Sequence, residues 1–128
     1  MLALSPFRVG IDVEQIRPLD VAQVDTPVLT AAEREAVMAL PEGPDRTTAF
    51  LRCWTRKEAV LKALGIGLTT DLTALESRGW AEGPAHVTTS ALGSPSTWRM
   101  ATVPTPAGWV AALALPAGAD RPPSVRLL

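Results

Sequence analysis

Apolar and polar residues alternate from Phe7 to Ile16, and β-branched side chains are frequent in this stretch. The alternation predicts a β-strand. Its apolar residues share one face: Val9, Ile11 and Val13. Asp12 and Glu14 point to the opposite face, and their Cα atoms lie about 6.6 Å apart because side chains repeat every second residue. The strand therefore presents two neighbouring carboxylates on one side.

The run from Ala49 to Gly67 has a helical period instead. Its apolar residues recur at intervals typical of a helix face packed on a core: Phe50, Cys53, Val60, Leu61 and Leu64. Along another edge, Trp54, Glu58 and Lys62 are successive i,i+4 neighbours, with Lys57 one step around the helix. We predict a long central helix that buries one side and presents a carboxylate flanked by two ammonium groups on the other.

A shorter helix is predicted from Ala31 to Leu40. Thr30 and Glu33 have the spacing of a capping box, in which each side chain bonds a backbone amide at the start of the helix. The sequence from Pro41 to Pro44 ends this helix, and Asp45 is placed to cap the central one. Two consecutive helices are therefore expected after the acidic strand.

Beyond Gly65, which is placed to end the central helix, the pattern changes to short extended segments separated by Gly, Pro and Ser. Three of them are predicted strands, the last two forming a hairpin: Ala85 to Ser90, Thr97 to Val103 and Trp109 to Leu115. The final strand is apolar on both faces, which favours a central position in the sheet. Residues from about 117 to 128 are expected to form a loose tail.

These elements predict an α+β fold with an N-terminal strand, two to three helices and then antiparallel strands, the central helix packing across the sheet. A length of 128 residues suits a single domain over residues 1–128. Hydrophobic residues make up 47% of the chain and charged residues 20%, which is typical of a folded globular protein. We expect one packed domain and no disordered region beyond the tail.

Composition and charge exclude several classes of function. The net charge of -1 argues against a nucleic-acid binder, because such domains carry clustered Lys and Arg. A single cysteine, Cys53, and a single histidine, His86, exclude Cys/His zinc sites and disfavour Ser-His or Cys-His catalysis. The first residues lack the features of a secretory signal, and no apolar run is long enough to cross a bilayer. We expect a cytoplasmic protein.

The acidic strand and the charged helix edge each have an ordinary explanation as solvated surface. Glu-to-Lys pairs at i,i+4 are common on exposed helices and contribute only about 0.2 to 0.5 kcal/mol each. Paired strand carboxylates, however, repel unless a positive charge lies between them, and a divalent cation would supply it. Taken together, the two motifs favour phosphate chemistry, because Mg²⁺ takes one or two carboxylates plus substrate phosphate oxygens.

The two motifs, in their residues and in their order along the chain, resemble those of the 4′-phosphopantetheinyl transferases. The strand reads Gly10-Ile11-Asp12-Val13-Glu14, and the helix about forty residues later reads Trp54-x-x-Lys57-Glu58-Ala59-x-x-Lys62. Arg17-Pro18 after the first motif and Gly65-Ile66-Gly67-Leu68 after the second agree with the same family, and the resemblance covers Val9 to about Pro116. The residues of both motifs resemble those in the C-terminal half of the larger, two-halved members that activate peptide and polyketide synthases.

The resemblance implies transfer of the 4′-phosphopantetheine arm of coenzyme A to a serine of an acyl or peptidyl carrier protein, as in a holo-[acyl-carrier-protein] synthase. It implies Mg²⁺ as the cofactor, with Asp12, Glu14 and Glu58 as its ligands. It also places Glu58 near the incoming serine hydroxyl as general base, directly or through a water.

The resemblance further implies how the basic residues grip coenzyme A. Lys62 would hold the α-phosphate and stabilise the charge of the leaving group, and Lys57 or Arg17 would reach other phosphate oxygens. These three residues are the predicted phosphate-binding groups.

The chain also departs from the family pattern. Two-halved members grip the nucleotide end of coenzyme A with an N-terminal half that carries basic residues and a Ser-His motif, whereas this chain begins almost at the acidic strand. The short, trimeric members have about this length, yet they usually show a late Ser-His motif that is absent here. We therefore hypothesise self-association, or pairing with another chain, to complete the cleft. The alternative is a catalytically incomplete homologue that binds coenzyme A or a carrier protein, or one subunit of a split transferase.

Overall fold

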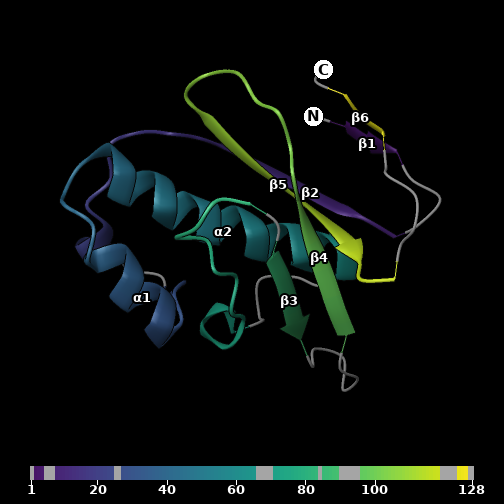
Figure 1. Ribbon diagram of the computed structural model, residues 1–128, viewed down its shortest axis with the longest axis horizontal. Coiled ribbons are helices and arrows are strands. Elements are labelled where there is room, and N and C mark those ends of the chain that lie inside the picture. The colour runs from purple at the N-terminus through teal and green to yellow at the C-terminus, as the bar shows by residue number, and fades with distance from the viewer. Residues whose placement is uncertain are drawn as a thin grey trace.

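The computed structural model describes residues 2–4, 8–24, 27–65, 71–83, 85–89, 96–118 and 124–126. Its central layer is a four-stranded antiparallel sheet in the order β2-β5-β4-β3. These strands span Gly10–Gln15 (β2), Ala85–Thr89 (β3), Ser96–Thr102 (β4) and Trp109–Pro116 (β5). One long helix, α2 (Pro44–Leu64), crosses one face of the sheet (Figure 1). The predicted α+β fold is confirmed, including the central position of β5.

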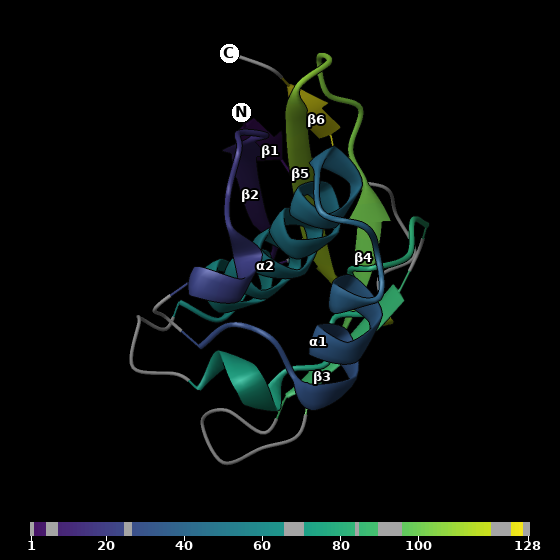
Figure 2. The same cartoon turned by 90° about the vertical axis from the view of Figure 1, so that its left-hand side faces the viewer.

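Two α-helices follow β2, and α1 (Ala31–Met38) packs against α2 (Figure 2). The capping box of α1 is confirmed, since the Thr30 hydroxyl accepts from the Glu33 amide at 3.1 Å and the Glu33 carboxylate accepts from the Thr30 amide at 2.8 Å. Short 3₁₀ turns, η1 (Val21–Gln23) and η2 (Leu72–Ala74), lie in the connections.

The ends of α2 differ in how well the sequence predicted them. The cap predicted at Asp45 is wrong: Gly43 is the N-cap, with φ of 134°, and Pro44 is the first helical residue. Proline suits this position because the amide it lacks has no partner inside the helix. At the other end, Gly65 adopts the left-handed conformation with φ of 70°, as predicted. The turn predicted at residues 65–67 extends outside the described residues.

Strand β2 runs beside α2 at very short range. A Cβ atom on Gly10 would lie 1.9 Å from the Ala59 carbonyl oxygen, so only glycine allows this approach. Asp12 and Glu14 lie on the same face as Gly10 by the alternation of side chains, and this face is turned to α2. The apolar face with Ile11 points away from the helix; the sequence predicted that it lies opposite the carboxylates but not which face meets α2. The close crossing therefore brings the strand carboxylates to the edge of α2.

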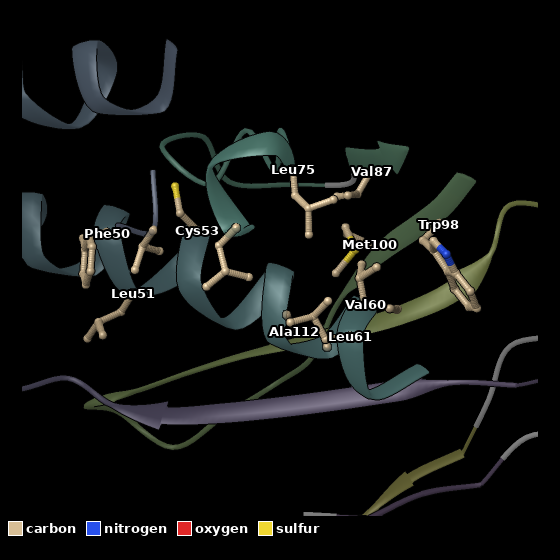
Figure 3. Packing of buried hydrophobic residues seen from close by; sticks show 14 of the residues in the cluster. Phe50, Leu51, Cys53, Val60, Leu61, Leu75, Val87, Trp98, Met100 and Ala112 are labelled. Carbon is tan, nitrogen blue, oxygen red and sulfur yellow. The ribbon is translucent and has the colours of Figure 1, made fainter. Parts of the chain in front are cut away.

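The main core lies between α2 and the sheet. Figure 3 shows α2 side chains packed with others from the sheet and with Leu75, which directly follows η2; the labelled residues are Phe50, Leu51, Cys53, Val60, Leu61, Leu75, Val87, Trp98, Met100 and Ala112. A second, smaller cluster centres on Val103, Leu113 and Leu115. Because Ala112 packs toward α2, Leu113 and Leu115 lie on the opposite face of the sheet. The sheet is thus apolar on both faces near β5.

The two ends of the chain meet in a second sheet. Strand β1 (Leu2–Leu4) pairs antiparallel with β6 (Ser124–Arg126), with Ala3 opposite Val125. The prediction of a loose tail is therefore wrong at residues 124–126, because a strand at the start of the chain supplies the hydrogen-bonding partners that composition alone does not reveal. In the ranges that the structure describes, no helix combines the length and apolarity needed to cross a membrane.

Candidate active site

The crossing of β2 and α2 brings Asp12 and Lys62 into contact. The Lys62 ammonium donates to Asp12 Oδ1 with Nζ and Oδ1 2.6 Å apart. The side chain of Asp12 is 9% exposed and that of Lys62 is 53% exposed. Residues fifty positions apart, predicted to belong to one site, are therefore joined by a charge-assisted hydrogen bond at the edge of the helix.

Glu58 lies one helical turn before Lys62 and is partly buried. Among the described residues, neither Glu58 Oε1 nor Asp12 Oδ2 has a hydrogen-bond partner, although both atoms are buried. Buried carboxylate oxygens without a partner are costly, and each needs a donor, a water or an ion. Two such atoms belong to carboxylates that interact with each other at this edge, so a donor, a water or an ion is needed here.

The charges of the carboxylates oppose one another. Burial raises the pKa of Asp12, and the charge of Glu14 adds to this rise. The hydrogen bond and charge of Lys62 act against it, but the pKa still lies above its ordinary value. Burial and then the charge of Asp12 raise the pKa of Glu58, with a smaller contribution from Glu14 and an opposing one from Lys62. A cation placed among these groups would relieve the repulsion.

Arg17 lies at the end of β2, where it pairs with Glu14. Its Nη1 is 3.3 Å from Glu14 Oε2 and donates to the Gln15 carbonyl oxygen at 3.0 Å. The Arg17 side chain is half exposed, and Nη1 is its only nitrogen with a hydrogen bond among the described contacts. The structure thus places the predicted phosphate ligand Arg17 beside the outer of the two strand carboxylates.

Lys57 is absent from this edge, and the prediction that it reaches phosphate is wrong. Its side chain is fully buried and its ammonium donates to the Val28 carbonyl, to Glu33 Oε1 at 2.5 Å and to the Leu72 carbonyl at 2.9 Å. An ammonium has three donors, and all three are used. One step around the helix is a rotation of about 100°, which turns Lys57 from the site into the interior.

Glu33 is a buried partner that the sequence reasoning missed. It accepts from the Lys57 ammonium, from the Ser77 hydroxyl and amide, and from the Thr30 amide. Burial alone would raise its pKa, but the hydrogen bonds from Lys57 and Ser77 outweigh burial and hold the pKa below its ordinary value. The capping box pointed to Glu33, yet nothing in the local pattern showed that it also binds α2.

Arg56 is a second buried charge that was not anticipated. Its guanidinium donates to the carbonyl oxygens of Ser77, Arg78, Ala81 and Gly83, at 2.8 to 3.1 Å. These bonds attach the loop before β3 to α2. Lys57 and Arg56 therefore support the helix from the interior, while Glu58 and Lys62 remain at its accessible edge.

The donor set of this edge suits a hard cation with an incomplete protein shell. The two unpartnered oxygens, Asp12 Oδ2 and Glu58 Oε1, are carboxylate oxygens, the ligand type that Mg²⁺ prefers. Within the described part of the chain, no three His, Cys, Asp or Glu side chains converge into a closed metal cluster. Mg²⁺ usually binds through one or two carboxylates together with waters and substrate phosphates, so the residues present fit this ion.

A cavity of about 580 Å³ adjoins the end of β2. It lies between residues 16–21 and the start of α2, at residues 42–44 and 46–47, and Arg17 is part of its wall. Much of the lining is aliphatic, including Ile16, Leu19 and Val21. Because Arg17 pairs with Glu14, the cavity lies next to the carboxylate edge and not on a distant surface.

In this α+β protein, carboxylates from a strand and a helix thus lie beside an exposed ammonium. The family model described as the 4′-phosphopantetheinyl transferase superfamily matches residues 8–114. The chain belongs to this superfamily. The match includes β2, α2 and Arg17 after β2, and therefore all of the predicted site residues.

Two relatives support the assignment. The chain is 33% identical over 84 residues to the 4′-phosphopantetheinyl transferase psf-1 of Bacillus pumilus, covering 65% of this chain and 35% of that protein. It is 36% identical over 81 residues to the 4′-phosphopantetheinyl transferase pptA of Paxillus involutus, covering 55% of this chain and 30% of that protein. The chain thus matches about a third of the length of these relatives.

Proposed function

We propose that this protein transfers the 4′-phosphopantetheine arm of coenzyme A to a serine of an acyl or peptidyl carrier protein in an Mg²⁺-dependent reaction. The observation that carries the proposal is the pair of buried, unpartnered oxygens of Asp12 and Glu58 beside the Lys62 ammonium. The superfamily membership supports the same chemistry.

The carboxylates Asp12, Glu14 and Glu58 are the proposed metal ligands. Asp12 and Glu58 each have a free buried oxygen, and Glu14 lies on the same face of β2. When bound, Mg²⁺ would neutralise charge on the pyrophosphate of coenzyme A. Glu14 also holds the half-exposed Arg17, which we propose as a further phosphate ligand.

Glu58 is the proposed general base. Its carboxylate lies at the accessible edge of α2, one turn before Lys62, where a bound hydroxyl would meet it. Glu58 takes the proton of the serine hydroxyl, directly or through a water, and the serine oxygen forms the new bond to phosphorus. The pyrophosphate bond breaks and adenosine 3′,5′-bisphosphate leaves, its developing charge stabilised by Lys62.

The carrier protein is proposed to approach over the cavity at the end of β2. The cavity offers aliphatic side chains next to Arg17, which suits contact with an apolar patch of a protein surface. Its position beside the carboxylate edge would bring an attached serine toward Glu58.

The test is incubation of the protein with coenzyme A, Mg²⁺ and several apo carrier proteins, followed by mass spectrometry of the carriers. The expected result is a mass increase equal to one phosphopantetheine group on at least one carrier, prevented by removal of Mg²⁺ with a chelator. Coenzyme A binding with no modification of any carrier would favour the alternative, a binding module or one subunit of a split transferase.

We also propose that a second copy of the chain or a partner subunit completes the cleft. The face of the sheet turned away from α2 carries partly buried Ile11, Ala101 and Ala111 around Leu113, and Trp109 at its margin is 41% exposed. Apolar area of this kind favours association. Light scattering should give a mass above that of one chain, and a monomer at micromolar concentration that still modified a carrier would contradict this proposal.

A cytoplasmic location is part of the same proposal. Cys53 is a free, fully buried thiol, and burial together with the charge of Glu33 raises its pKa to about 12. Such a thiol is unreactive and suits a reducing compartment. Fractionation of cells that express the protein is the corresponding measurement.

A further inference from the structure

Lys62 and Asp12 differ in their freedom to move. Lys62 belongs to the last turn of α2, and 53% of its side chain is exposed. Asp12 is 9% exposed and is held in β2, between α2 and its strand partner Ala112. If the contact between them opens, the lysine side chain can rotate into solvent while the aspartate remains in place.

The two oxygens of Asp12 are in different situations. Oδ1 accepts from Lys62 Nζ at 2.6 Å, whereas Oδ2 has no partner among the described residues. A cation held by Oδ2 and by Glu58 Oε1 would lie on a carboxylate that an ammonium already neutralises. Two positive charges on one carboxylate repel, and the repulsion is strong at a partly buried site.

We infer that Lys62 is an internal counter-ion that the divalent cation displaces from Asp12, and that the displaced ammonium then becomes a phosphate ligand. The inference rests on the proposed function. It couples the two events: Lys62 is held on Asp12 before the cation binds, and its three donors become available to phosphate when the cation takes its place.

Arg17 has a different part in the same charge balance. It pairs with Glu14 at 3.3 Å, and among the described contacts it does not reach Asp12 or Glu58. Glu14 Oε2 is engaged by Arg17, and neither oxygen of Glu14 is a buried, unpartnered atom. Competition with the cation is therefore expected mainly at Lys62, because Glu14 is more exposed than Asp12 and solvent screens the repulsion on Arg17.

Cation binding to the full chain tests the displacement directly. Titration with Mn²⁺, followed by electron paramagnetic resonance and calorimetry, should show that Lys62→Met binds Mn²⁺ about fivefold more tightly than the wild type, because no ammonium competes. Lys62→Gln should behave in the same way. The matched control is Arg8→Gln, which also removes one positive charge beside the end of α2, where Arg8 bonds the Leu64 carbonyl; its affinity should change by less than about twofold.

Pyrophosphate binding tests the second half of the inference. Without a cation, Lys62→Met should change pyrophosphate affinity by less than about twofold, since Lys62 is held by Asp12 in the wild type. With Mn²⁺ saturating the protein and pyrophosphate supplied as its Mn²⁺ complex, the variant should bind about tenfold more weakly than the wild type. An equal loss in both conditions would overturn the coupling.

The outcomes separate this inference from the proposed function. Saturable Mn²⁺ binding with equal affinity in wild type and Lys62→Met would contradict the displacement and leave the proposed function standing. The same holds if Arg8→Gln tightens Mn²⁺ binding as much as Lys62→Met does, because the effect would then be general charge removal. Failure of every protein to bind Mn²⁺ saturably would contradict the proposed function, and the displacement with it.

Discussion

Two lysines five residues apart on α2 form carboxylate pairs of opposite character. Lys57 and Glu33 are both fully buried, and all donors of the ammonium are used. Lys62 and Asp12 are bonded at nearly the same distance, but the lysine is half exposed and one aspartate oxygen has no partner. The pKa of Glu33 is lowered and that of Asp12 is raised. The first pair is complete and supports the fold, whereas the second is incomplete and available for chemistry.

The difference follows from how many hydrogen bonds each carboxylate receives. Glu33 is buried, yet donors from Lys57, Ser77 and Thr30 compensate for the loss of water. Asp12 is compensated by Lys62 and has Glu14 and Glu58 as negative neighbours. Burial therefore stabilises a charge only where the protein supplies enough donors. The supply at Asp12 is incomplete, as the proposed cation site requires.

The largest effect is expected from breaking the complete pair. Lys57→Met leaves the Glu33 carboxylate buried without its cation, so we predict a loss of about 3 to 5 kcal/mol in the free energy of unfolding. Urea denaturation followed by circular dichroism measures it. The double variant Lys57→Met/Glu33→Gln should recover part of this loss, because no unpaired charge remains; a single variant within about 1 kcal/mol of the wild type would contradict the assignment.

A smaller effect of opposite sign is expected at the incomplete pair. Asp12→Asn removes a carboxylate whose raised pKa shows that ionisation is unfavourable in the folded protein. The free energy of unfolding should therefore rise by up to about 1 kcal/mol at neutral pH, while Mn²⁺ binding is lost. The same urea experiment measures the stability. A loss of stability comparable to that of Lys57→Met would show that Asp12 supports the fold as Glu33 does.

The two pairs should also respond to pH with opposite signs. Because the pKa of Glu33 is lowered, its contribution to stability is present above the ordinary glutamate pKa of 4.5 and is lost as pH falls through the folded-state value. The raised pKa of Asp12 means that the folded protein binds more protons than the unfolded chain above 3.8, so stability falls as pH rises through that window.

The difference in unfolding free energy between the wild type and each variant, followed as a function of pH, isolates the contribution of each carboxylate. The free energy of unfolding of the wild type should exceed that of Glu33→Gln by an amount that increases as pH rises through the acidic range. The free energy of unfolding of Asp12→Asn should exceed that of the wild type by an amount that increases as pH rises above 3.8. Denaturation at a series of pH values measures both. With each difference taken as wild type minus variant, the slope should be positive for Glu33→Gln and negative for Asp12→Asn; two slopes of the same sign would mean that the two carboxylates are not in contrasting environments.

The smallest effect on stability is expected for Arg17→Gln. The Arg17–Glu14 pair lies at the surface, with side chains 52% and 29% exposed, so its loss should cost roughly 0 to 1 kcal/mol. If Arg17 contacts phosphate as proposed, the KM for coenzyme A should still increase. A change in stability above that range, with an unchanged KM, would make Arg17 a structural residue.

The sequence predicted those parts of the molecule that depend on short-range pattern. The alternation in β2 placed Asp12 on the correct face, the i,i+4 spacing placed Glu58 and Lys62 on one edge, and the capping box located the start of α1. Combining the two motifs assigned Asp12 and Lys62 to one site, since neither motif alone distinguishes a site from a solvated surface. Their direct hydrogen bond was not predicted and is a finding of the structure.

The errors concern long-range partners. Lys57 looked equivalent to Lys62 in the helical pattern, and only the position of α1 and η2 shows that it is enclosed. The strand at Ser124–Arg126 forms because Leu2–Leu4 pairs with it, a contact that spans the whole chain. Local composition contains no information about either partner, so these features could not be derived from it.

The most direct test of the proposed chemistry compares Glu58→Gln with the wild type in the carrier-modification assay. The substitution keeps the shape of the side chain and removes a charge that is unfavourable in the folded protein, so the variant should be at least as stable as the wild type. We predict that transfer of phosphopantetheine, measured by the mass of the carrier, falls by at least about a hundredfold. Turnover equal to that of the wild type, in a folded Glu58→Gln protein, would contradict both roles proposed for Glu58 and the assignment of this edge as the active site.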